Sequence, residues 1–201
     1  MDQITQWVIG ASGSPWVLPI VALLTILDAF LVIVPSETAV VALAILSVSS
    51  GTPNLALLIV VAALAAMIGD SLTYALGHQL GAPLLARIRS LRVQSVFAWA
   101  RTALERRAAL VIFVARYIPY GRVAVNLVAG ATGFGYRRFL PLSALACLAW
   151  SVYNVALGAT VGAWLGDNPV LAVFVSVVVA VAIGLLIDGV RGGRERRQTA
   201  D

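Results

Sequence analysis

The sequence has no lysine, one cysteine and one histidine, and only 11% of its 201 residues are charged. A single cysteine, Cys147, cannot form a disulfide within the chain or build a cysteine metal cluster. The only histidine is His78, and neither a HExxH nor a GxSxG arrangement occurs. The chain therefore lacks the usual hydrolase signatures, and no enzyme, metal site or cofactor is predicted.

Apolar residues are abundant instead. Hydrophobic residues make up 61% of the chain and the mean hydropathy is +0.96. A soluble domain of this length would not keep so much apolar surface out of water. The composition predicts an all-α polytopic membrane protein, with one membrane domain over residues 15–190. An interfacial segment, 1–14, precedes it, and a basic tail, 191–201, follows it.

Every basic charge is an arginine, and the net charge is +5. Arginines cluster in residues 87–107 and 191–197, outside the longest apolar runs. Such clusters are typical of cytoplasmic loops and of contact with anionic headgroups, which we favour over nucleic-acid binding. The arginines of 87–107 alternate with large apolar residues, so this segment is predicted to be an amphipathic helix on the membrane surface.

In the first half, an apolar run that contains Asp28 stops at Pro35-Ser36-Glu37, and a shorter run follows. The second run is too short to cross a bilayer. A re-entrant hairpin over 16–50, broken near Pro35, fits this pattern, and one long kinked helix is the alternative. A span over 53–80 follows. It carries Asp70, for which a functional or ion-paired role is expected, and His78, which is expected to be a surface or capping residue.

The second half centres on Arg116 and Arg122, which flank Pro119 and Gly121 within an apolar stretch. An arginine near the bilayer centre costs at least ~2.5–3.5 kcal/mol, so each should face protein or water and have a partner. Proline and glycine favour a helix break between them. Residues 109–135 are therefore predicted to form a second re-entrant hairpin, followed by spans over 139–165 and 170–187.

The positive-inside rule places Arg87–Arg107, Arg137, Arg138 and Arg191–Arg197 all in the cytoplasm. The segment 109–135 must then leave and return on one side, and the C-terminus is expected to be cytoplasmic. An ALGxxxG pattern at Ala75–Gly81 recurs at Ala156–Gly162, 81 residues later. Since each copy closes a span that follows a hairpin, the pattern indicates an inverted repeat, an arrangement common in transporters.

Three motifs resemble the DedA family, which is also called the VTT or SNARE-associated domain. They are Pro35-Ser36-Glu37, the helix Gly69-Asp70…Tyr74…Gly77…Gly81, and Phe113-Val-Ala-Arg116-Tyr-Ile-Pro119-Tyr-Gly-Arg122 followed by Ala129-Gly130. The last matches the family pattern F-x-x-R-[FY]-x-P-x-x-R. The resemblance covers residues 15–190. The break before Glu37 departs from the family pattern, which usually has a second proline and a glycine.

The resemblance implies paired re-entrant hairpins, function linked to the proton motive force, and lipid movement between leaflets of the bacterial inner (plasma) membrane. It suggests undecaprenyl phosphate or a phospholipid as cargo. By residue match, the family's essential acidic positions fall on Glu37 and Asp70, and its essential basic positions on Arg116 and Arg122. The expected partners are a lipid with a phosphate headgroup and protons, in a monomer or a homo-oligomer.

From the residues themselves, we expect Arg116 and Arg122 to bind phosphate, because guanidinium gives bidentate, permanently charged donors. Asn126 would add a polar contact or form a helix–helix hydrogen bond. Alternatively, the two arginines serve as structural ties to Glu37 and Asp70. A proton-coupled transporter of small ions or oxyanions is the rival function, and a purely structural membrane adaptor is a third.

Overall fold

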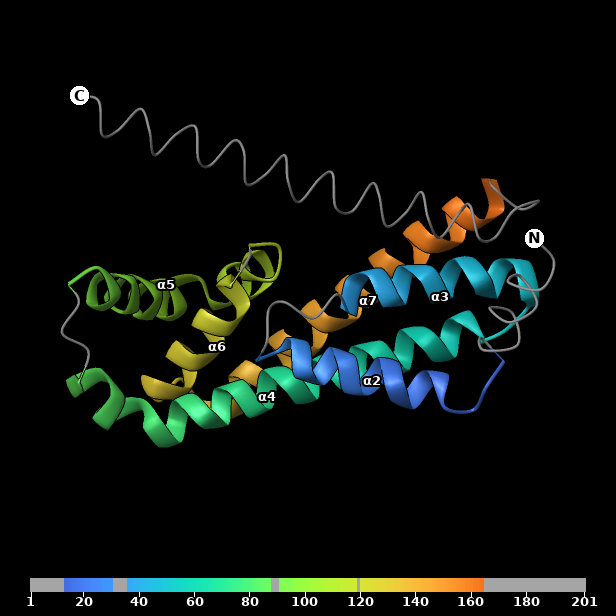
Figure 1. Ribbon diagram of the computed structural model, residues 1–201. Coiled ribbons are helices and arrows are strands. Elements are labelled where there is room, and N and C mark those ends of the chain that lie inside the picture. The colour runs from blue at the N-terminus through green and yellow to red at the C-terminus, as the bar shows by residue number, and fades with distance from the viewer. Residues whose placement is uncertain (1–12, 31–35, 88–90, 119, 165–201) are drawn as a thin grey trace, which may run out of the picture.

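The computed structural model describes residues 13–30, 36–87, 91–118 and 120–164 (Figure 1). All the regular elements in these ranges are helices, as predicted. They are α2 (Val17–Asp28), α3 (Ser36–Ser50), α4 (Leu55–Arg87), α5 (Leu91–Ala115), α6 (Gly121–Ala131) and α7 (Tyr136–Trp164). Within the described ranges, Leu55–Gly81 of α4 and Tyr136–Trp164 of α7 are long and apolar enough to cross a membrane.

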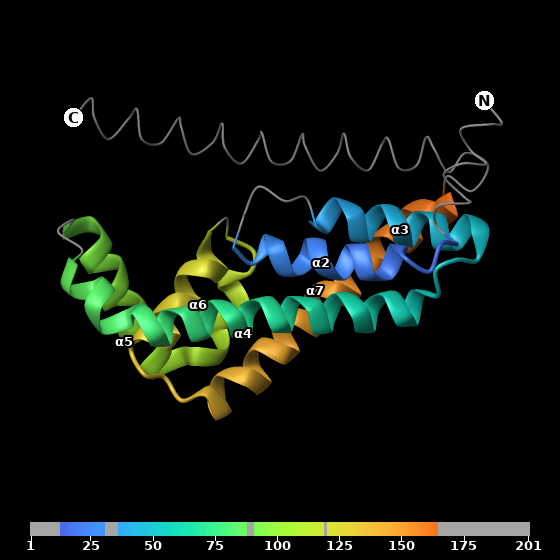
Figure 2. The same ribbon diagram turned by 60° about the horizontal axis from the view of Figure 1, so that its bottom comes forward.

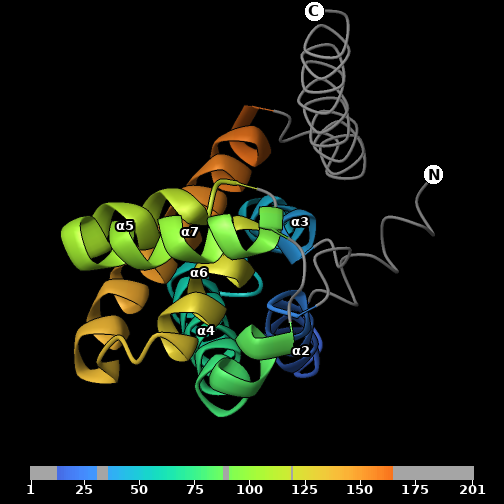
Figure 3. The same cartoon turned by 90° about the vertical axis from the view of Figure 1, so that its left-hand side faces the viewer.

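The long helices α4 and α7 run in opposite directions along the molecule (Figures 1 and 2). Helices α2 and α3 are antiparallel to each other and lie beside one half of this pair. Helix α6 packs against the other half of α4, and α5 extends across that end of the bundle (Figure 3). Each half of the chain thus supplies two shorter helices and then one long one.

Local signals explain where α3 ends and α4 begins. Gly51 follows α3 with a φ of 75°, a left-handed conformation that glycine adopts without a Cβ penalty. Pro53 follows two positions after Gly51, and the Asn54 side chain then accepts a hydrogen bond from the Leu57 N–H at 3.1 Å. Such a cap satisfies an N–H that has no partner within the helix.

Small residues allow α4 and α6 to approach closely. A Cβ on Gly77 of α4 would overlap the backbone of Leu127, and one on Gly130 of α6 would overlap the backbone of Tyr74. The second ALGxxxG copy does the same on α7, where a Cβ on Gly158 would lie 2.5 Å from the carbonyl oxygen of Val41 in α3. Each long helix therefore packs its repeated glycines against the second short helix of the opposite half.

The predicted boundaries need several adjustments. Helix α2 ends at Asp28, before the expected stop at 35–37, and Glu37 lies in the first turn of α3. Helix α5 contains a kink at Arg107 (φ −146°, ψ 49°), where two helices meet, and this kink coincides with the end of the amphipathic segment predicted over 87–107. The predicted break around Pro119 is present between α5 and α6. Pro35, Pro119, residues 1–12, the span 170–187 and the tail lie outside the described residues.

Candidate functional site

A buried ion pair joins Arg116, just after α5, to Asp70 in the middle of α4. The Arg116 Nη1 lies 2.9 Å from Asp70 Oδ2, and the two side chains are only 3% and 2% exposed. Leaving one member of such a pair without the other is costly, because an uncompensated charge then stays buried. This pair therefore fixes the link between α5 and α6 onto α4.

Helix α7 completes the surroundings of this pair. The Ser143 hydroxyl donates to Asp70 Oδ2 at 2.7 Å, and the Cys147 thiol lies 3.4 Å from the same oxygen. The Arg116 Nη2 donates to Cys147 Sγ at 3.1 Å, and its guanidinium carbon lies 5.7 Å from the centre of the Trp150 ring. Positions 143, 147 and 150 share one face of α7, so a single helix face supplies all three contacts.

Two buried atoms of the pair form no hydrogen bond with the part of the chain that the structure describes. Among the described residues, nothing forms a hydrogen bond with Asp70 Oδ1 or with Arg116 Nε, although both atoms are buried. Buried polar atoms are nearly always bonded, so such exceptions often mark functional positions. Within the described residues, Asp70 Oδ1 is thus an acceptor, and Arg116 Nε a donor, that a ligand could use beside the buried ion pair.

A second ion pair lies at the start of α6. The Arg122 Nη2 is 2.7 Å from Asp28 Oδ2 at the end of α2, and the same nitrogen contacts the Asp28 carbonyl oxygen at 2.5 Å. Ser36, the first residue of α3, donates to Asp28 Oδ2 at 2.5 Å. The Arg122 and Asp28 side chains are 14% and 10% exposed, so this pair is more accessible than Arg116–Asp70.

The chain between the two arginines is tightly turned. Tyr120 has a φ of 62°, which is the left-handed region that non-glycine residues rarely adopt. A Cβ on Gly121 would lie 2.7 Å from the carbonyl oxygen of Ala115, so glycine is required there by close approach. Strained backbone of this kind clusters at functional sites. Here it brings Arg116 and Arg122 to two different carboxylates of the first half.

Glu37 was offered together with Asp70 as a structural tie for the two arginines, and the structure bears this out for Asp70 but not for Glu37. Among the described residues, Arg116 and Arg122 pair with Asp70 and Asp28, and Glu37 pairs with neither. Glu37 is an exposed residue whose Oε1 accepts a hydrogen bond from Trp150 Nε1 at 3.4 Å. Trp150 contacts both residues, since its Nε1 donates to Glu37 and its ring faces the Arg116 guanidinium.

Asn126 lies near the second ion pair. It is buried on α6, one turn after Arg122.

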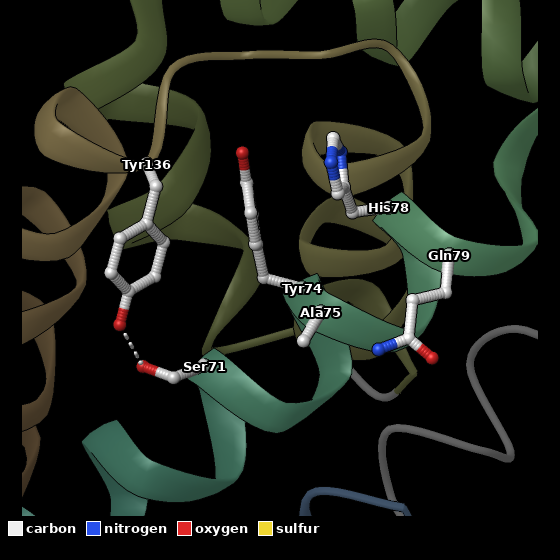
Figure 4. A pocket seen from close by; sticks show the side chains of 6 residues that line it. All are labelled: Ser71, Tyr74, Ala75, His78, Gln79 and Tyr136. Carbon is white, nitrogen blue, oxygen red and sulfur yellow. Dashed lines mark hydrogen bonds between the residues drawn. The ribbon is translucent and has the colours of Figure 1, made fainter.

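His78 lies on the surface of α4. It is exposed and stacks beside Tyr74, with ring centroids 6.4 Å apart, as expected for a surface residue. His78 lines a pocket of about 280 Å³ (Figure 4). Tyr136 and Ser71 line the same pocket, and their hydroxyls form a hydrogen bond with each other. Within the described ranges, no three metal-binding side chains gather into a group that could hold a metal ion.

No sequence pattern assigns a role to Asp28, Ser143 or Trp150, and Ser36 enters only as part of the Pro35-Ser36-Glu37 break. A signal for Asp28 was present, because it is the only charged residue in the first apolar run. The other three are uncharged, and no spacing rule links Ser143 to Asp70, Ser36 to Asp28 or Trp150 to Arg116. Only the packing of α3 and α7 brings them to the two pairs.

Comparison with known proteins gives concordant matches. The family model of the VTT domain matches residues 34–160, more than half of the chain. Protein DedA of Escherichia coli K12 is 25% identical over 183 residues, which cover 88% of this chain and 84% of that protein. Undecaprenyl phosphate transporter A of Bacillus subtilis is 28% identical over 167 residues, covering 77% of this chain and 82% of that protein.

A third relative carries a different name. The alkaline phosphatase-like protein of Lactococcus lactis is 30% identical over 147 residues, covering 65% of this chain and 67% of that protein. No solved structure matches the chain.

Proposed function

The chain belongs to the VTT domain family, and from that premise we propose that it is a membrane transporter that moves a phosphate-bearing lipid between leaflets. One observation carries the proposal: Arg122, at the break between α5 and α6, is held by Asp28 in a pair that is still partly accessible. A guanidinium in that setting exchanges one anionic partner for another without being moved into a new environment.

Arg116 and Arg122 have separate tasks in this proposal. Arg116 is nearly inaccessible and contacts Asp70, Cys147 and Trp150. Its task is to stabilise the conformation of the backbone between α5 and α6. Arg122 is the contact for the lipid phosphate, which displaces the Asp28 carboxylate. Asn126 lies buried one turn further along α6, and in this proposal its amide adds a second polar contact beside Arg122. The lipid tail stays in the bilayer throughout.

We further propose that transport is linked to protons through Glu37 and Asp70. Glu37 is an exposed carboxylate in the first turn of α3, so a proton added to it breaks neither of the two ion pairs that hold the arginines. Asp70 Oδ1 has no hydrogen-bond partner among the described residues, so a proton added there breaks none of the contacts that Oδ2 makes. Protonation of Asp70 weakens its attraction to Arg116 and loosens the break between α5 and α6.

The proposed setting is the bacterial inner membrane, with the C-terminus in the cytoplasm. In this arrangement the α2–α3 pair and the α5–α6 break enter the membrane from opposite sides as re-entrant hairpins, while α4 and α7 cross it. The apolar helices α2 and α3 have 12 and 15 residues, fewer than the ~20 that span the hydrocarbon core, in keeping with re-entry.

Reconstitution in liposomes tests this function. Purified protein is incorporated into vesicles that carry a trace of polyprenyl phosphate, and lipid in each leaflet is measured against time with and without a pH gradient. Parallel vesicles are loaded with inorganic phosphate or sulfate. Released inorganic phosphate is measured in the lipid samples, because one relative carries a phosphatase-like name.

We expect faster equilibration of the lipid phosphate between leaflets, no flux of the small anions and no phosphate release. Flux of inorganic phosphate or sulfate without lipid movement would favour the oxyanion transporter instead. Release of phosphate from the lipid would favour an enzyme. Lipid movement that ignores the pH gradient would remove the proton linkage and leave the lipid transport in place.

A further inference from the structure

Trp150 of α7 contacts both regions that carry the candidate site. Its Nε1 donates to Glu37 Oε1, 3.4 Å away in the first turn of α3. Its ring faces the guanidinium of Arg116, whose Cζ is 5.7 Å from the ring centre. Trp150 is 4% exposed, whereas Glu37 is exposed. One buried side chain therefore connects an exposed carboxylate to a buried arginine.

We infer that Trp150 is a positioning residue that transmits the ionisation of Glu37 to the Arg116–Asp70 pair. The inference rests on the proposed function, because it explains how an exposed acid controls a pair that protons in water do not reach directly. It also accounts for the absence of a direct ion pair between Glu37 and either arginine in the described part of the chain.

The physical basis is the shared indole ring. The indole N–H is the only hydrogen-bond donor of tryptophan. An ionised carboxylate is a stronger acceptor than a protonated one, and a bonded N–H pushes electron density into the ring. A cation over the ring face is attracted by that density. Ionised Glu37 therefore strengthens the hold of Trp150 on Arg116, and protonated Glu37 weakens it.

Other ionisable groups surround these residues and must be separated from Glu37 in any test. The carboxylates are Asp28 on α2, which bonds Ser36, and Asp70 on α4. The other groups are the thiol of Cys147 on α7 and the guanidinium groups of Arg116 and Arg122 around the break between α5 and α6. Asp70 is the principal competitor, since it contacts Arg116 directly.

Two substitutions separate the hydrogen bond of Trp150 to Glu37 from its ring contact with Arg116. Trp150→Phe keeps an aromatic face toward Arg116 but removes the N–H that bonds Glu37. Trp150→Leu removes both. Trp164→Phe is the matched control, because Trp164 lies on the same helix and is 94% exposed. Glu37→Gln supplies the variant in which the carboxylate itself no longer ionises.

The direct readout is the indole N–H resonance of Trp150 in nitrogen-15 spectra of the purified full chain in detergent micelles, assigned by its loss in Trp150→Phe. Spectra are recorded between about pH 4 and pH 9, which covers ordinary and raised carboxyl pKa values. We expect the resonance to move with pH in the wild-type protein and to stay in place in Glu37→Gln. A resonance that does not move in the wild type, or moves equally in Glu37→Gln, overturns the inference.

The second readout is the ratio of transport rates at the two ends of the pH range. We expect Trp150→Phe to reduce this ratio to about a third or less of the wild-type value, because it removes one hydrogen bond to a charged group. Trp164→Phe should leave the ratio unchanged. A Trp150→Phe ratio equal to that of wild type would contradict the inference. Because the spectra need no cargo, absent transport would refute the proposed function alone, and the indole titration would still decide the role of Trp150.

Discussion

Arg122 of α6 and Asp28 of α2 form an ion pair that bridges the two halves of the chain, with Nη2 2.7 Å from Oδ2. The residues are 94 positions apart in the sequence. Arg116 makes the corresponding contact with Asp70, so both arginines around the break between α5 and α6 are neutralised by carboxylates from the first half. The two pairs differ in exposure, and their expected responses to substitution differ accordingly.

Asp70→Asn should be the more destabilising change at these pairs. It leaves Arg116 charged and buried, which costs about 3–5 kcal/mol in the free energy of unfolding. Asp28→Asn should cost less, because Arg122 and Asp28 are partly accessible and water replaces the lost attraction. Unfolding in mixed detergent micelles measures both. Adding Arg116→Gln to Asp70→Asn should recover part of the loss, and a cost for Asp28→Asn as large as that for Asp70→Asn would contradict this ranking.

Glu37→Gln should leave stability near the wild-type value and flatten the response of transport to a pH gradient. The carboxylate makes no ion pair with Arg116 or Arg122 in the described structure, so its loss leaves both buried pairs intact. Transport and unfolding are measured on the same preparation. Normal pH dependence in Glu37→Gln would exclude Glu37 as the coupling carboxylate and leave Asp70 as the candidate.

Cysteine labelling tests whether the α5–α6 break is re-entrant. Thr102→Cys and Gly135→Cys place thiols at exposed positions before and after the break. Both should react with a membrane-impermeant reagent from the cytoplasmic side only, as the arginine clusters require. Trp164→Cys, at the far end of α7, should react from the opposite side. The native Cys147 is fully buried and should stay unlabelled. Labelling of positions 102 and 135 from opposite sides would rule out the second hairpin.

Gly77→Ala should destabilise the packing of α4 on α6. The added Cβ overlaps the backbone of Leu127, which belongs to a helix and cannot swing aside as a flexible side chain does. A cost of about 1–3 kcal/mol is typical of overpacking. Gly135→Ala is the matched control, because nothing lies within 4 Å of its Cβ and its φ is not positive. Equal unfolding free energies for the two variants would mean that the close approach of α4 and α6 does not contribute to the stability of the protein.

The sequence predicted the helical class and the break between Arg116 and Arg122, because both depend on local composition and spacing. For the partners of the arginines it offered Glu37 and Asp70, and of these two only Asp70 forms an ion pair with an arginine in the described residues. Asp28, Asp70 and Glu37 all carry the same charge, and only the packing of α2 beside α4 decides which carboxylate reaches which guanidinium. Glu37 lies in the first turn of α3, as a helix break at Pro35-Ser36-Glu37 predicts, and the neighbouring Ser36 bonds Asp28.

Arg122 is the proposed contact for the lipid phosphate, and the most direct test is the initial rate at which Arg122→Lys moves polyprenyl phosphate between the leaflets of reconstituted liposomes. Lysine keeps the charge and can still pair with Asp28, but it lacks the planar fork that holds a phosphate bidentately. We expect a rate about tenfold below that of the wild type at equal protein incorporation, because one charge-assisted hydrogen bond is worth about 1.5 kcal/mol or more. A wild-type rate in Arg122→Lys would contradict the proposal that Arg122 binds the lipid phosphate.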